Sequence, residues 1–305
     1  MSNLAIMEQQ KSLQSSDPAA VAAAEAVKAR IQSAYQMAIF RPRSEAGARQ
    51  KILDACKNKT FAEAAEYSKP VGGSAIKGPS IRFAELALRE WGNVIVETQM
   101  LYEDDATRRV RVSVLDLETN ASFGRDITIS KTVERANASG REVVGQRTNT
   151  SGKAVYIVKA TDDEIANKES AQISKVVRNE GLRLIPADIV EEAMDEVHRT
   201  LKSATSKDLK TERKKVADAF LTLGVPVDEI ESYLGRSIER ATDDDIVNLR
   251  SVYNTIKSGE SKWADYMYQA EKEQKTEQKV IGLEESQNAI KDAVGKLKEN
   301  NAYPV

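Results

Sequence analysis

Side chains suited to catalysis or metal binding are scarce in this chain of 305 residues. It has one histidine, His198, and one cysteine, Cys56, and neither has a neighbour at metal-ligand spacing. Neither a catalytic triad nor a zinc site can therefore be assembled from them. We expect Cys56 to be a buried structural thiol and His198 to be a surface or packing residue of a helix.

Nucleotide-dependent and metal-dependent chemistry also lack their usual motifs. The segment Gly72-Gly-Ser-Ala-Ile-Lys77 is the nearest approach to a phosphate-binding loop, but it lacks the lysine spacing and the following hydroxyl. The acidic clusters at residues 104–105, 162–164 and 243–245 each fall at an expected turn or helix start, where acids are favoured. A two-metal nuclease would need them to converge on one site. We therefore expect a protein that is not an enzyme and that uses no cofactor and no metal.

Charge is distributed unevenly along the chain, although the net charge is only −2. From Arg125 to Lys159 there are seven Lys and Arg against three Asp and Glu, a net charge of +4. From Thr205 to the end there are 16 against 19, a net charge of −3. A basic middle beside an acidic end predicts that a polyanion is held in the middle. No apolar run is long enough for a signal peptide or a membrane span, so we expect a cytoplasmic protein without membrane contact.

The hydrophobic periodicity predicts an α+β fold. Strands are expected at 94–101, 108–117 and about 123–130, and the turn at Asp104-Asp105 makes the first two an antiparallel pair. The three strands form a β-meander. A long helix over 163–184 would pack on it, stopped by Pro186.

Further helices and loops complete the expected fold. Helices are expected at 18–37, 45–56, 61–67, 81–91 and 188–202. Ser80 is placed to cap the helix at 81–91 and Gly92-Asn93 to end it, while Thr242 caps the last helix of the C-terminal part. The stretch 69–80 is expected to be loop and short strand, 134–153 a mobile loop or irregular hairpin, and 155–158 a short strand.

These elements suggest five segments. Residues 1–17 are expected to be disordered, 18–203 to be the main domain with a helical N-terminal segment, and 204–210 to be a Lys/Ser/Thr linker. A small all-helical C-terminal domain is expected at 211–268. The remaining residues, 269–305, are expected to be a charged tail that is flexible or helical.

The helix expected at 163–184 is the main evidence for binding of a polyanion. With about 100° per residue and Lys168 as origin, Lys175 lies near −20°, Arg178 near −80° and Arg183 near +60°. The apolar residues fall between about 80° and 180°, and they are Ile173, Val176, Val177 and Leu184. One side should therefore pack on the sheet while the other presents cations. An ordinary solvated charged face is the alternative explanation.

The aromatic content of 5% favours a particular way of binding a polyanion. Proteins that sequester single strands stack bases on aromatic platforms, but the basic region offers only Phe123 and Tyr156. A protein that grips phosphates and leaves base edges free could pair complementary strands. Its binding should depend strongly on salt.

Three stretches of the sequence resemble a known family. They are Ile76–Val94 (IKGPSIRFAELALREWGNV), Val114–Asn120 (VLDLETN) and Ser170–Pro186 (SAQISKVVRNEGLRLIP). Together with the order of elements over residues 30–268, they resemble phage proteins akin to the RecT and lambda Beta annealing recombinases. The resemblance implies a strand, a glycine-containing turn and helix, a β-meander, a long basic helix and a small helical C-terminal domain.

The resemblance also implies a function. It implies ATP-independent binding of single-stranded DNA and annealing of complementary strands through a duplex intermediate, by a homo-oligomeric ring or helical filament in the cytoplasm of a bacterial host. A phage exonuclease and the host single-strand-binding protein would dock on the C-terminal domain. The DNA contacts expected are Lys77, Arg82, Arg125, Lys131, Arg135, Arg147, Lys153, Lys159, Lys175, Arg178 and Arg183.

Alternatives stay open at this stage. Arg183 borders the apolar stripe and could instead form a structural ion pair with Asp188 or Glu192. A metal-dependent nuclease or other DNA-processing enzyme would be revealed by cleavage of labelled single strands with magnesium or manganese. A phage structural or adaptor protein without a DNA role would fail to retain an oligonucleotide at any salt concentration.

Overall fold

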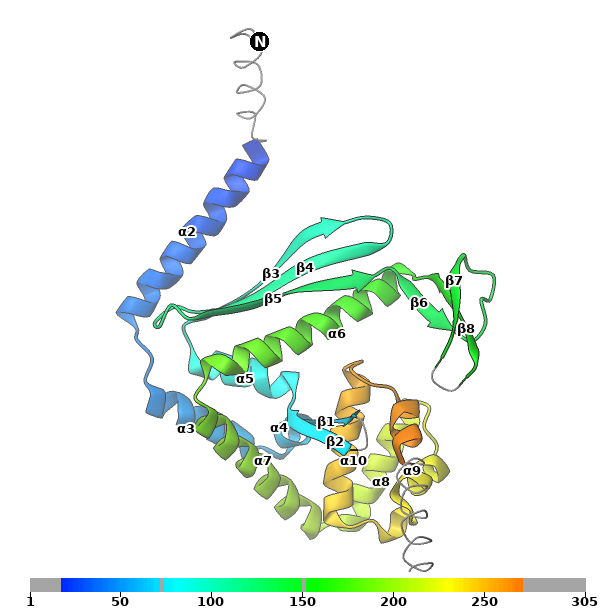
Figure 1. Cartoon of the computed structure of the whole chain (residues 1–305). Helices are drawn as coiled ribbons and strands as arrows, with labels where there is room; N and C mark the ends of the chain where they lie inside the picture. The colour runs from blue at the N-terminus through cyan, green and yellow to red at the C-terminus, as the bar shows by residue number, and fades with distance from the viewer. Residues whose placement is uncertain (1–17, 72–73, 150–151, 271–305) are drawn as a thin grey trace, which may run out of the picture.

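The computed structural model describes residues 18–71, 74–149 and 152–270 of the chain, which form an α+β fold with antiparallel sheets (Figure 1). The helices are α2 (Pro18–Phe40), α3 (Glu45–Cys56), α4 (Lys59–Ala64), α5 (Ile81–Trp91), α6 (Asp162–Gly181), η1 (Leu182–Leu184), α7 (Ala187–Lys207), α8 (Leu209–Thr222), α9 (Val227–Leu234), η2 (Ile238–Arg240) and α10 (Asp243–Lys257). The strands are β1 (Glu66–Val71), β2 (Ser74–Pro79), β3 (Val94–Glu103), β4 (Thr107–Asp116), β5 (Ser122–Ser130), β6 (Thr132–Arg135), β7 (Val143–Thr148) and β8 (Ala154–Lys159).

The central sheet is the predicted β-meander, with strand order β3-β4-β5. Its valine and isoleucine side chains alternate with polar ones, so one face is apolar, and α6 lies along that face (Figure 1). The residues buried between sheet and helix are Val110, Val112, Ile127, Ile129, Ile165, Val176 and Val177. The α+β class and the long helix on the sheet are therefore confirmed.

Helix α5 begins and ends where the sequence predicts. The Ser80 side chain accepts a hydrogen bond from the Phe83 backbone N–H at 3.2 Å. Gly92 and Asn93 then take positive φ angles of 74° and 51° and end the helix. Helix α6 comes very close to α5 at Gly181, where a Cβ atom would lie 2.7 Å from Leu88 Cδ1. Only glycine fits this contact without a shift of Leu88.

Two smaller sheets correct the expected elements. The helix expected at 61–67 ends at Ala64, because Glu66–Val71 pairs with Ser74–Pro79 as an antiparallel hairpin. This pairing is a tertiary preference that local periodicity does not reveal. The stretch 134–153 holds β7 and the end of β6, and both pair with β8 in a sheet of order β6-β8-β7. A register shift between Val143 and Gly145 makes this hairpin irregular.

The C-terminal helices pack around a core of their own. Its buried side chains are Val216, Phe220, Val225, Ile230, Ala241, Ile246, Leu249, Val252 and Tyr266. We call residues 209–270 the C-terminal unit, and they form only helices, turns and loops. As predicted, Thr242 caps α10, with Asp245 completing the capping box.

The prediction of a linker at 204–210 is wrong. Helix α7 continues to Lys207, and Asp208 alone separates it from α8, where its side chain accepts from the Thr211 N–H. Thr205 is fully buried, and its hydroxyl accepts from Arg250 Nη1 at 3.2 Å. The Lys/Ser/Thr composition resembles a linker, but this contact to α10 places it inside the fold.

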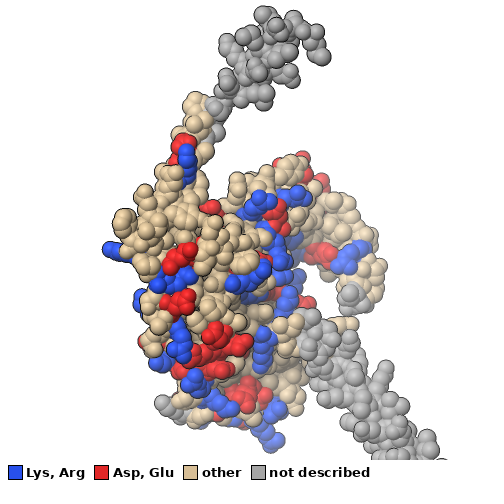
Figure 2. All heavy atoms as spheres, turned by 60° about the vertical axis from the view of Figure 1, so that its left-hand side comes forward, with Lys and Arg blue, Asp and Glu red and all other residues tan. Residues whose placement is uncertain are grey.

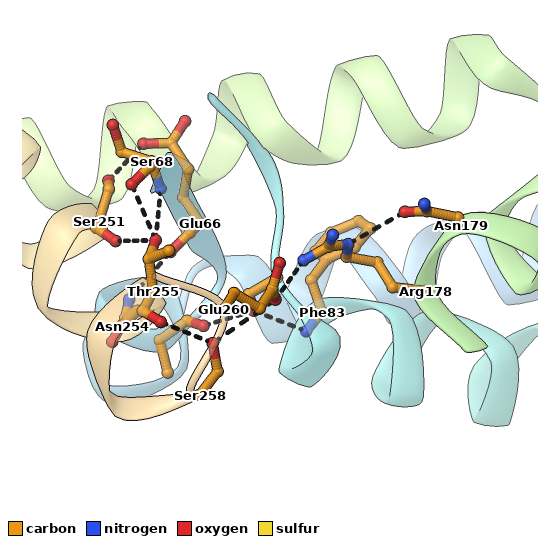
Figure 3. Close-up of polar contacts among 12 residues, drawn as sticks. Glu66, Ser68, Phe83, Arg178, Asn179, Ser251, Asn254, Thr255, Ser258 and Glu260 are labelled. Atoms are coloured by element: carbon orange, nitrogen blue, oxygen red, sulfur yellow. Dashed lines mark hydrogen bonds and ion pairs between the residues drawn. The ribbon is translucent and has the colours of Figure 1, made fainter. Parts of the chain in front are cut away.

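The C-terminal unit docks on the β1–β2 hairpin through buried polar contacts (Figure 3). Thr255 Oγ1 accepts from the Ser68 backbone N–H at 2.9 Å, and the Ser251 hydroxyl donates to Glu66 at 2.6 Å. His198, on α7, lies 2.7 Å from the same Glu66 carboxylate. This hydrogen bond raises the pKa of His198, despite its partial burial. His198 is therefore a half-exposed contact residue.

One further prediction concerns the burial of Cys56. Cys56 is fully buried as expected, and burial raises the pKa of its thiol to about 12.

Helix α2 extends away from the rest of the described chain, and most of its side chains are exposed (Figure 1). No helix among the described residues is both long and apolar enough to cross a membrane.

Candidate nucleic-acid interface

Helix α6 positions the candidate interface. Thr161 and Glu164 form a capping box at its start, and three acids in its first turn complement the helix dipole. Its apolar side packs on the sheet, which leaves Gln172, Lys175 and Asn179 exposed on the opposite side. The basic side chains discussed below come from this helix and from the strands beside it.

At the C-terminal end of α6, two arginines share one buried carboxylate. Glu180 is only 5% exposed at its side chain, and it pairs with Arg125 of β5 at 2.8 Å and with Arg183 of η1 at 2.7 Å. Both guanidinium groups are mostly exposed. Two positive charges against one negative leave this cluster with a net charge of +1. The alternative partners expected for Arg183, Asp188 and Glu192, are not used, and Glu192 binds Arg49 instead.

The same arrangement recurs at the N-terminal end of α6. Glu164 pairs with Arg135 of β6 and, at 2.8 Å, with Arg141. The Thr161 backbone hydrogen bond and these two arginines lower the pKa of Glu164 to about 2, so it stays ionised. Within this second cluster the net charge is again +1, but the exposed Asp162 and Asp163 of the same first turn add two negative charges beside it.

Between the two clusters lie two lysines that form no salt bridge with the residues that the structure describes. Lys168 donates to the backbone carbonyls of Ser130, at 3.3 Å, and Thr132. The hydrogen bond from Arg147 lowers the pKa of the nearby Glu134, and the charge of Lys168 adds to this effect. Lys175 is exposed and forms no ion pair with any residue that the structure describes. Nearby, Arg108 and Lys131 are balanced by Glu103 and Glu169 and add no net charge.

These groups follow one another from one end of α6 to the other, and we call the set the α6 line: the Arg135–Arg141–Glu164 cluster, Lys168, Lys175 and the Arg125–Arg183–Glu180 cluster. Glu164 and Glu180 are sixteen residues apart (180 − 164) on one helix. At about 1.5 Å per residue, the line is about 24 Å long. Its shape suits a linear polyanion.

Arg178 is the clearest wrong prediction. The helical wheel places it on the outward half of α6, but its side chain is only 5% exposed. It pairs with Glu260 of the C-terminal unit at 2.6 Å (Figure 3). Its guanidinium also lies 4.1 Å from the centre of the Tyr67 ring. A wheel separates the sheet-facing side from the rest, but it cannot show that a distant segment covers the other side. Arg178 therefore cannot contact a phosphate in this structure.

The remaining predicted cations are not members of the α6 line. Arg147 pairs with Glu134 at 2.7 Å, Lys159 approaches Glu142 at 3.9 Å, and Arg82 approaches Glu85 at 3.4 Å. Lys153 and Lys77 are exposed and form no ion pair with the described residues. On the face shown in Figure 2, basic and acidic side chains lie next to one another, with no large patch of one sign. Ion pairing thus reduces the charge that these residues can offer.

Sequence reasoning missed the carboxylates that organise the interface. Glu164 was considered only as part of an acidic cluster and Glu180 not at all, although each determines how much positive charge its arginines retain. The pairing of Arg125 with Glu180 joins residues 55 apart in sequence, which no local pattern reveals.

The acidic clusters occupy structural positions. Asp104 accepts from the N–H groups of Ala106 and Thr107 in the β3–β4 turn, and the other two clusters lie in the first turns of α6 and α10. Among residues 18–71, 74–149 and 152–270, no three His, Cys, Asp or Glu side chains are grouped to hold a metal ion.

Comparison with known proteins adds no relative: no protein family, no curated protein and no solved structure matches this chain.

Proposed function

We propose that this chain binds single-stranded DNA through its phosphates along the α6 line and anneals complementary strands without ATP. The observation that supports this best is the repeated cluster in which two arginines share one carboxylate, with Lys168 and Lys175 between the clusters. A nucleic acid that meets this line gains charge-assisted hydrogen bonds to phosphate at several successive points. The resemblance to RecT and lambda Beta proteins points to the same function.

The placement of the aromatic residues also favours annealing over sequestration. The rings of Phe220, Tyr233, Tyr253, Trp263 and Tyr266 contact one another inside the C-terminal unit. They are therefore not available to form a stacking platform along the α6 line. A strand held mainly by its phosphates keeps most of its base edges free to pair.

Annealing should need neither nucleotide nor metal. With complementary labelled strands, chelator and no ATP, the protein should accelerate duplex formation over a protein-free control. The reason is that holding phosphates removes the repulsion between two strands and needs no chemical step. Strand pairing can be followed by fluorescence energy transfer. A rate equal to the protein-free rate would contradict the proposed function.

Partner contacts belong to the same proposal. The C-terminal unit exposes Leu221, Val227 and Tyr268, where we place the docking of a phage exonuclease and of the host single-strand-binding protein. For self-association we place the contact on α2. Its small apolar residues Ala24, Val27, Ile31, Ala34 and Ala38 recur every three or four positions. Ala38 is buried against the body, whereas Val27 at the projecting end is 47% exposed.

Replacing Val27 with aspartate should break up the oligomer without unfolding the subunit. A charge on this stripe would have to be buried between two copies, whereas in the single subunit it stays in water. Light scattering should therefore show a lower mass for Val27→Asp, with an unchanged melting temperature. Ser33→Asp places the same charge on another side of the helix and should keep the wild-type mass. Equal masses for wild type and Val27→Asp would show that α2 is not the contact.

A further inference from the structure

An open pocket lies beside the C-terminal end of the α6 line. Its volume is about 890 Å³, and its apolar walls include Trp91, Phe123, Leu182, Leu184, Pro186 and Val190. It is formed where the end of α5, the start of β5, η1 and the start of α7 meet. The function proposed above makes no use of this pocket.

Two guanidinium groups lie over aromatic rings at its walls. Arg183 is centred 3.9 Å from the Phe123 ring, and Arg43 lies 4.4 Å from the Trp91 ring. Arg43 is held rigidly, because it donates to Asp116 at 2.8 Å and to the carbonyls of Trp91 and Gly92 at 3.1 and 3.0 Å. The Arg183 guanidinium is more than half exposed, so a flat ligand can reach the Phe123–Arg183 pair.

Residues of the pocket wall also contact the α6 line. Phe123 and Arg125 are two positions apart on β5, so they lie on the same face of the sheet. Arg125 and Arg183 share Glu180, and Arg183 also covers Phe123. A phosphate held by this cluster would therefore place its attached nucleoside beside the pocket.

The lining selects an uncharged aromatic ligand over a second phosphate. Besides Asp116, which is paired with Arg43, the carboxylates Glu45 and Glu191 line the same pocket and would repel a phosphate. They are suited to accept hydrogen bonds from the amino group of a base. Aromatic rings and guanidinium planes are the surfaces on which unpaired bases stack in proteins.

From this geometry we infer that the pocket receives one unpaired nucleobase of the bound strand, stacked on the Phe123–Arg183 pair. The inference rests on the proposed function, since the phosphates of the same strand lie on the α6 line. The ring contact uses only the face of the base, whereas a hydrogen bond from its amino group to Glu45 or Glu191 would occupy part of the pairing edge, so this one base would pair only after it leaves the pocket. One captured base per subunit would fix the register of the strand on the protein.

The test compares oligo-dC with an oligomer of abasic deoxyribose phosphates of equal length, which has the same charge and no bases. Wild type should bind oligo-dC about tenfold more tightly. Phe123→Leu should bind both oligomers equally, with the wild-type salt dependence, because the phosphates are untouched. Phe123→Trp keeps a ring and should restore the preference. Tyr102→Leu, at the opposite end of the sheet, is the matched control and should keep the preference.

The outcomes separate this inference from the proposed function. Circular dichroism first establishes that each variant is folded. If the wild type binds both oligomers equally, or if a folded Phe123→Leu retains the preference, the base pocket is contradicted. Neither result contradicts phosphate binding along the α6 line. A wild type that binds neither oligomer at any salt concentration overturns the proposed function, and the base pocket with it.

Discussion

Replacing Arg178 with alanine is expected to destabilise the fold by about 3–5 kcal/mol, which is the usual cost of removing one partner of a buried ion pair. The side chains of Arg178 and Glu260 are 5% and 7% exposed, so the alanine variant leaves a carboxylate buried without its cation. It also removes the guanidinium from the Tyr67 ring. Urea unfolding followed by circular dichroism should show a clearly lower midpoint.

A double variant separates charge from packing in this prediction. Arg178→Met with Glu260→Leu replaces both charges with apolar side chains of similar size, which is often neutral for a buried pair. It should recover most of the stability that Arg178→Ala loses. Arg178→Lys keeps the charge but loses the planar contact with Tyr67, so it should fall between alanine and wild type. An unchanged unfolding midpoint for Arg178→Ala would contradict the buried pair.

Much of the fold could be predicted from local signals. The helix at 45–56 has the bounds that the sequence indicates, and Ser80 and Thr242 cap α5 and α10 as expected. The alternation of Val110, Val112 and Val114 with polar residues identified the central strand. These features depend on residues a few positions apart, so periodicity and capping chemistry are sufficient to reveal them.

The failures share one physical origin, which is contact between distant segments. Arg178 is covered by Glu260, 82 residues later, and Thr205 is held by Arg250. The expected linker at 204–210 and the expected exposure of Arg178 were wrong because the C-terminal unit covers both places. A helical wheel or a composition shift contains no information about such a covering segment.

The sequence predicted which residues belong to the candidate site better than it predicted how much net charge they carry. Arg125, Arg135 and Arg183 do lie beside α6, as the basic-helix hypothesis requires, and Lys175 is exposed. Their charge is partly cancelled by carboxylates that become neighbours only on folding. The DNA-binding role of all these residues stays a prediction.

Changing Lys175 and Arg125 together to alanine should weaken the salt dependence of DNA binding. Lys175 has no ion pair among the described residues, and without Arg125 the remaining Arg183 is neutralised by Glu180. Two positive charges of the α6 line are thus removed. Each phosphate contact on a single strand contributes about 0.7 to the slope of log affinity against log salt, so the slope should fall by about 1.4. Stability should hardly change, because both side chains are mostly exposed.

Two further variants serve as controls for this measurement. Lys214→Ala removes an exposed lysine of the C-terminal unit and should leave the slope unchanged. Glu164→Gln should act in the opposite direction, because glutamine keeps the capping box but frees the charges of Arg135 and Arg141. It should raise both the affinity and the slope.

The salt slope of oligonucleotide affinity is therefore the most direct test of the α6 line. Fluorescence anisotropy at several salt concentrations gives it for wild type, Lys175→Ala with Arg125→Ala, Glu164→Gln and Lys214→Ala. The account predicts a slope lowered by about 1.4 for the double variant, raised for Glu164→Gln and unchanged for Lys214→Ala. A folded double variant with the wild-type slope would contradict the claim that DNA phosphates lie along α6.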